Sequence, residues 1–178
     1  GSDTLSGALA RAAGSDVGTY AITIGSLANS NYSITFVPAN FAVTAKPITV
    51  SVTAGQTKVY GESDPAFAYT ITSGGPLVGS DTLSGALARA AGSDVGTYAI
   101  NVGSLANANY DITFVASNFA ITAKPITVTA DAKSKVYGNS DPALTYTLSG
   151  SLVGSDTVSG ALSRTGTDAV GSYTITQG

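Results

Sequence analysis

A long internal repeat is the feature that most constrains this chain. The first 45 residues recur 78 residues later, and only 7 of the 45 aligned positions differ. The segment KPITV also recurs after 78 residues, at Lys46 and Lys124. A spacing this long between near-identical copies is typical of a tandem array, in which each copy is one folding unit. The differing pairs are Thr23/Asn101, Ile24/Val102, Ser30/Ala108, Ser33/Asp111, Pro38/Ala116, Ala39/Ser117 and Val43/Ile121.

The last copy is shorter than the one before it, and this helps to place the loops. The segment KVYG recurs after 77 residues, at Lys58 and Lys135, and LVGSDT recurs after 75. One residue is therefore missing before KVYG and two more before LVGSDT. Both gaps fall where turn-forming residues gather, in Ala54-Gly55-Gln56 and in Ser73-Gly74-Gly75-Pro76. Because loops tolerate changes of length and strands in register do not, we expect loops at both places.

The phase of the repeat predicts three segments. We expect residues 1–45 to be the C-terminal part of a repeat, residues 46–123 a complete repeat and residues 124–178 the N-terminal part of another. The two outer segments would then expose unpaired strand edges. The short Ala-Lys-Pro joints contain a proline, which fixes its own backbone angle and restricts the residue before it. They predict a semi-rigid rod in which each repeat adds about 30–40 Å.

The pattern of side chains predicts an all-β fold. The chain is rich in Thr, Val, Ile and Tyr, which favour strands, and in Gly, Asn and Asp, which mark turns. About seven short strands within 78 residues favour a small β-sandwich of immunoglobulin-like type, with β-grasp-like modules as the alternative. A helix across residues 81–91 would favour that alternative. The expected strands are Ile48–Thr53, Lys58–Tyr60, Phe67–Ile71, Leu83–Ala88 (strand or one helical turn), Thr97–Val102, Tyr110–Val115 and Phe119–Thr122.

Composition weighs against several classes of function. The net charge is -3 and only 11% of residues are charged, so no basic surface for nucleic acid is expected. No apolar run approaches the roughly 20 residues that span a membrane. The chain has no Cys and no His, which removes thiolate metal sites and the usual bases and nucleophiles. We therefore expect neither an enzyme nor catalytic, cofactor-binding or metal-binding residues.

Three tyrosines recur at equivalent places. Tyr20 and Tyr98 end the motif Asp-Val-Gly-Thr-Tyr, and Tyr173 ends a related one in which the Asp is displaced by one position. In immunoglobulin domains a tyrosine two residues before a core position ties down a corner of the fold. Because Ile22, Ile100 and Ile175 follow two residues later, we expect largely buried corner tyrosines and not ligand-binding ones.

The carboxylates make a weak case for calcium, which requires several oxygen ligands at a fixed spacing. Glu62 and Asp64 offer two carboxylates, but the next copy replaces the first with Asn139 and keeps only Asp141. Turns in which each Asp bonds its own backbone are the simpler interpretation. The prediction is no cofactor.

The order of several motifs resembles the "mostly beta, glycine-rich" (MBG) repeats and the similar YDG-type repeats over the whole chain. Such repeats occur in very large secreted proteins, including filamentous-haemagglutinin-like adhesins of Gram-negative bacteria. The resemblance implies extracellular display at the bacterial surface and a part in adhesion, and it supplies no binding residue. The motifs are KVYGESDP from Lys58, KVYGNSDP from Lys135, LSG from Leu83, GTYAI from Gly96 and NYDITF from Asn109.

Two functions remain open from the sequence. The first is a structural spacer in a stalk, whose partners are the neighbouring repeats of the same chain. The second is a module that binds a glycan or a matrix protein weakly in each repeat, with the array gaining avidity. A binding module should carry a concave, aromatic-lined patch in every copy, and a spacer should not.

Overall fold

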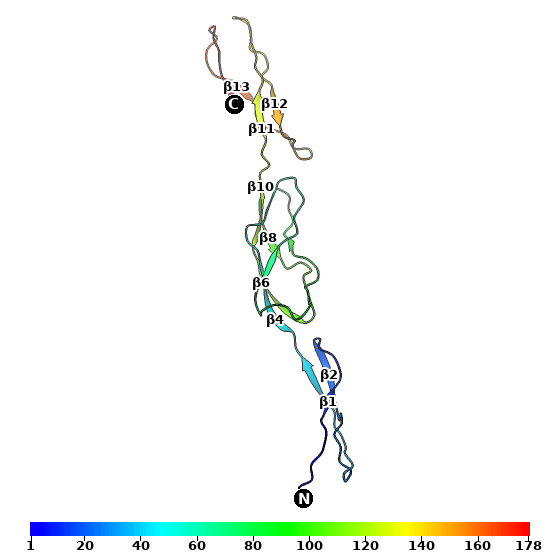
Figure 1. Cartoon of the computed structure of the whole chain (residues 1–178). Helices are drawn as coiled ribbons and strands as arrows, with labels where there is room; N and C mark the ends of the chain where they lie inside the picture. Colours follow the sequence, from blue (N-terminus) through cyan, green and yellow to red (C-terminus); the bar gives the residue numbers. More distant parts are fainter. The chain divides into compact units, whose positions relative to one another are not determined.

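The computed structural model describes all 178 residues, Gly1–Gly178, and they form fourteen β-strands and no helix. The predicted all-β class is confirmed, while the type of sandwich stays a prediction. No helix suited to crossing a membrane is present. We call residues 1–45, 46–123 and 124–178 the first, middle and third repeat (Figure 1).

The chain divides into two compact units. The first comprises Gly1–Gln56, Pro65–Gly92 and Thr97–Ala120, and the second comprises Thr57–Asp64, Ser93–Gly96 and Ile121–Gly178. The first unit therefore joins the first repeat to most of the middle one. The second unit joins the remaining segments of the middle repeat to the third.

In the first unit, the first repeat forms a sheet of three antiparallel strands. These are β1 (Ala10–Arg11), β2 (Gly18–Thr23) and β3 (Ala39–Val43), in the order β1-β2-β3. Strand β2 alternates half-buried and exposed residues, as expected of a strand with one covered face. Strand β3 lies at the edge of this sheet, and its Phe41 is 46% exposed.

The middle repeat contributes a second sheet to the first unit. Its central strand β4 (Lys46–Val52) pairs antiparallel with β6 (Tyr69–Ser73) and parallel with β9 (Tyr110–Val115). Strand β4 alternates strictly, because Ile48, Val50 and Val52 are buried and the residues between them are not. The alternation that predicted this strand therefore reflects one face turned to the core.

A further sheet of the middle repeat has the strand order β5-β10-β8-β7, with the bounds listed below. Strand β10 carries Phe119 and Ile121, which are 0% and 2% exposed, and β8 carries Ile100, which is 1% exposed. Together with β4, these strands provide most of the buried apolar side chains of the chain. The bounds are β5 (Thr57–Val59), β7 (Ala88–Arg89), β8 (Gly96–Asn101) and β10 (Asn118–Thr122).

The third repeat, in the second unit, forms two separate hairpin-like pairs. Strand β11 (Thr127–Ala130) pairs antiparallel with β12 (Tyr146–Ser149), and β13 (Leu162–Arg164) pairs antiparallel with β14 (Ile175–Gln177). None of its residues is fully buried, so the core lies in the middle repeat.

Several details differ from the expectations. Lys46 and Pro47 belong to β4 instead of a linker, so only Thr44 and Ala45 separate β3 from β4. Proline is tolerated there because it stands at the start of the strand. The expected strand over Leu83–Ala88 shrinks to an isolated bridge at Ser84 and the start of β7, since glycine interrupts the segment. No helix forms in it.

Candidate functional site

Each repeat places an arginine over the ring of the recurring tyrosine. The guanidinium carbons of Arg11, Arg89 and Arg164 lie 5.1, 4.9 and 5.3 Å from the ring centres of their tyrosines, Tyr20, Tyr98 and Tyr173. The arginines also donate to backbone carbonyls of the following turn, as Arg89 does to Gly92 O at 2.8 Å. Each arginine therefore joins the ring to the turn.

The tyrosines occupy equivalent positions and tie down a corner, as predicted. The hydroxyls of Tyr20 and Tyr173 each donate a hydrogen bond of 2.7 Å to the carbonyl oxygen four residues earlier, at Asp16 and Ala169. The expectation that they are largely buried is wrong, because all three are half-buried. Arginine covers one face of each ring in place of apolar neighbours, and this leaves part of the ring open to solvent.

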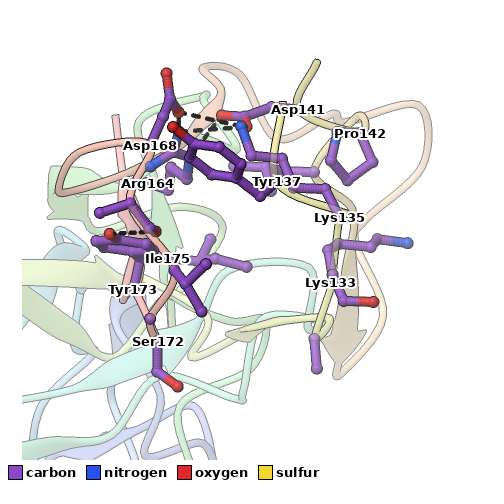
Figure 2. A pocket seen from close by; sticks show the side chains of 16 residues that line it. Lys133, Lys135, Tyr137, Asp141, Pro142, Arg164, Asp168, Ser172, Tyr173 and Ile175 are labelled. Carbon is purple, nitrogen blue, oxygen red and sulfur yellow. Dashed lines mark hydrogen bonds and ion pairs between the residues drawn. The ribbon is translucent and has the colours of Figure 1, made fainter. Parts of the chain in front are cut away.

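A network of ion pairs surrounds the arginine of the third repeat (Figure 2). Lys135 Nζ lies 2.6 Å from Asp141 Oδ1 and 3.1 Å from Asp168 Oδ1. Arg164 pairs with the same two carboxylates, through Nε to Asp141 and through Nη2 to Asp168. Two cations thus face two anions, and we call these four residues the charged cluster. The middle repeat has the equivalent pair Lys58–Asp64, at 2.7 Å.

The charges of the cluster stabilise one another. Arg164 and Lys135 lower the pKa of Asp141 to about 2, and Lys135 and Arg164 also lower the pKa of Asp168. In return, the hydrogen bonds from Asp141 and Asp168 raise the pKa of Lys135. These shifts move the pKa values away from neutrality, so the cluster stays ionised there and is suited to holding loops together.

The pH dependence of the cluster gives a first prediction. Because the pKa of folded Asp141 is about 2 and its ordinary value is 3.8, its stabilising contribution is present above about pH 4 and is lost as the pH falls toward about 2. Carboxyl-carbon NMR titration should report this low pKa, and Arg164→Met should raise it. The matched control is Lys133→Met, since Lys133 points away from the cluster (Figure 2). An unchanged pKa of Asp141 in Arg164→Met would contradict the assigned cause.

The acidic turn considered for calcium is engaged within the protein. Glu62 accepts a hydrogen bond of 3.1 Å from Val59 N, and Asp64 pairs with Lys58. Asp64 and Asp141 both make ion pairs with lysine, which the expectation of backbone bonds in these turns did not include. No group of three or more acidic side chains converges in the structure.

A second feature is the junction between the first and middle repeats, within the first unit. The side chain of Asn109 makes two hydrogen bonds to the first repeat. Its Nδ2 donates to Asp16 Oδ1 and its Oδ1 accepts from Val17 N, both at 2.9 Å. Its backbone oxygen accepts from Lys46 N at 2.9 Å, where β4 begins. We call this arrangement the Asn109 clamp. Sequence reasoning missed it because an Asn-Tyr pair in a turn looks like any other turn.

The second unit contains the corresponding junction between the middle and third repeats. Tyr60 lies beside Asp156 of the third repeat, whose carboxylate raises the pKa of the hydroxyl through a side-chain hydrogen bond. Gly61, at φ +88°, approaches the same region so closely that a Cβ there would lie 2.5 Å from Val153 Cγ2. Glycine is required at this position for both reasons.

A family comparison decides the class of the chain. The model of the MBG domain, YGX type, matches residues 1–42, 48–120 and 126–178. The chain belongs to this MBG family. No curated protein and no solved structure matches the chain. The resemblance drawn from the motifs is thereby confirmed, while the repeat boundaries at 45/46 and 123/124 stay a prediction.

The Tyr-Gly-X segments of this MBG chain have a clear structural basis. Gly61 and Gly138 have φ angles of +88° and +87°, which L-amino acids rarely adopt. The turn closes when Glu62 N donates to Val59 O at 3.1 Å and when Asn139 N donates to Val136 O at 3.0 Å. At the coarsest level, the chain is a series of repeat modules of a class found in bacterial surface or secreted proteins.

Proposed function

We propose that this MBG array is a spacer in the stalk of a bacterial surface adhesin, where it holds a distal adhesive region away from the cell. The observation that carries the proposal is the way in which the first repeat continues into the middle one. Only Thr44 and Ala45 separate the strands, and the Asn109 clamp bonds both sides of the joint. Extracellular display follows from the same proposal.

The Asn109 clamp stiffens the joint mainly by fixing the orientation of Asn109 relative to both repeats, and less by adding stability. A single hydrogen bond contributes only about 0.5–1.5 kcal/mol to stability, but three bonds to one residue constrain its orientation as well as its position. Within the middle repeat, Lys46 is itself anchored, because its Nζ donates to Pro76 O at 3.0 Å. A spacer needs joints of this kind, since a flexible joint would let the distal region fold back.

The alternative is a weak binding module for a glycan or matrix protein, acting by avidity. Such a module needs the same concave site in each copy. In the middle repeat, Arg89 lies over both Tyr98 and the fully buried Phe119, so a phenyl ring of the chain itself occupies the space beside the guanidinium. This packing favours the spacer. A glycan array and a cell-binding assay on the chain should therefore show no binding, and saturable binding to either would favour the alternative.

A distance measurement tests the stiffness of the first joint. Thr19 and Thr97 are exposed, lie on β2 and β8 and are 78 residues apart, and the chain has no native cysteine. Spin labels on Thr19→Cys and Thr97→Cys should give a narrow distance distribution centred at about 30–40 Å. A mean below about 15 Å would contradict an extended stalk.

The clamp itself is tested with Asn109→Ala in the same labelled chain. Loss of the three-way contact should broaden the distribution at least twofold without unfolding either repeat. The matched control is Asn31→Ala: Asn31 occupies the same turn of the first repeat, where its backbone amide also bonds the side chain of the Asn two residues earlier. Equal widths for the two variants would show that the clamp does not stiffen the joint.

A further inference from the structure

The neighbouring repeats are attached to the middle repeat through strands β4 and β10. The first repeat precedes Lys46, where β4 begins, and the third repeat follows Thr122, where β10 ends. Tension along the chain would therefore enter the middle repeat at these two strands. The end segments of a domain are often its least ordered parts unless they are tied down. How β4 and β10 are held thus decides how much tension the repeat can withstand.

Both strands are central strands of their sheets. Strand β4 lies between β6 and β9, and β10 lies between β5 and β8. Next to β10, Ala120 N donates to Gln56 O at 3.1 Å on one edge. On the other edge, just before the strand begins, Ser117 O accepts from Ile100 N at 2.9 Å. Neither strand can leave its sheet without breaking hydrogen bonds along both of its edges.

The same two strands hold more than half of the buried apolar side chains of the chain. Their buried residues are at most 8% exposed. Extraction of either strand would therefore expose the core to water as well as open a sheet. The buried residues are Ile48, Val50 and Val52 on β4, and Phe119 and Ile121 on β10.

The parallel pairing of β4 with β9 sets the direction in which tension acts. Lys46 lies opposite Tyr110 at one end of this pair, and Ser51 lies opposite Val115 at the other. Strand β9 leads into β10 after two residues. Tension would thus enter at the start of β4 and leave at the end of β9, two points about five residues or roughly 16 Å apart along the strands. The opposed forces run along the strands, so the hydrogen bonds between them are strained together and not one after another.

We propose that the middle repeat is a tension-bearing module, in which the paired strands β4 and β9 resist unfolding when the neighbouring repeats are pulled apart. The proposal rests on the spacer function, because a spacer between a cell and an attached adhesive region is stretched. It also goes beyond that function, since a joint can be stiff in a repeat that unfolds easily under force. Lys46 N donates to Asn109 O at 2.9 Å, so tension enters the repeat at the Asn109 clamp.

Pulling the full chain in two directions tests the proposal. The chain has no native cysteine, and Thr44, Ala108 and Ala123 are exposed and lie outside the strands. Handles on Thr44→Cys and Ala123→Cys apply tension as the array does. Handles on Thr44→Cys and Ala108→Cys pull β4 and β9 apart from the same end, which is the matched control. Both variants should unfold at the same urea concentration, so that only the direction of force differs between them.

We expect the Thr44/Ala123 pair to need at least about twofold more force than the Thr44/Ala108 pair at the same loading rate, because forced unfolding depends on the barrier along the direction of pulling. It should release about 220–250 Å of chain in one step, which is the extended length of the repeat less its folded length. Equal forces in the two directions, or release in several small steps, would overturn the proposal. A narrow spin-label distribution together with equal forces would retain the spacer and reject only the tension-bearing module.

Discussion

Replacing Phe119 with alanine should destabilise the middle repeat by about 3–5 kcal/mol, the range for deletion of a buried phenyl ring. The ring is fully buried, and its removal leaves Phe67 and Arg89 facing a cavity. A loss of this size is a large part of the stability of a small domain. Hydrogen exchange of the β8 and β10 amides, measured at increasing urea concentration, would give the loss of stability in the middle repeat itself.

The chain provides its own control for this experiment. Phe41 is the equivalent residue of the first repeat and is 46% exposed, so Phe41→Ala should cost only about 1 kcal/mol. The residue type and the repeat position are then the same, and only burial differs. Similar costs for the two substitutions would contradict the assignment of the core to the middle repeat.

Much of the fold could be predicted because repetition and alternation are local signals. The pattern of Ile48, Val50 and Val52 located β4, and the length differences between copies located the turn at Gly55, whose φ is +78°. The parallel pairing of β4 with β9 could not be predicted, since it joins residues far apart in the sequence. It also explains why Lys46 and Pro47 belong to a strand and not to a linker.

The charged cluster could be found only in part. Lys, Asp and Arg recur at corresponding positions in the middle and third repeats, so the signal was present in the sequence. The displaced position of Asp168 obscured this signal. An acidic residue whose position differs between repeats is a poor candidate for a functional role. In the structure, the carboxylate of Asp168 still reaches Lys135 and Arg164 from its shifted place. The spacing of residues in the sequence does not show which partners a side chain can reach in the fold.

Substituting Gly92 with alanine should cost roughly 2–6 kcal/mol, because two penalties combine at this position. Its φ of +143° is one that alanine rarely adopts, and an added Cβ would lie 2.2 Å from Tyr98 Cε1. Neither partner can move freely: Arg89 lies over the Tyr98 ring at 4.9 Å and donates to Gly92 O at 2.8 Å. The free energy of unfolding of the middle repeat would measure the cost.

Two comparisons separate the penalties. Gly55 also has a positive φ, +78°, but a Cβ there would meet nothing within 4 Å, so Gly55→Ala should cost only about 1–2 kcal/mol. The double variant Gly92→Ala/Tyr98→Ala removes the ring that the new methyl group would strike. It should therefore be less destabilised than the sum of the two single variants, which is the signature of direct contact in a double-mutant cycle. Strict additivity would mean that Gly92 is required by its backbone angle alone, and that the close packing of the turn against the corner tyrosine contributes nothing.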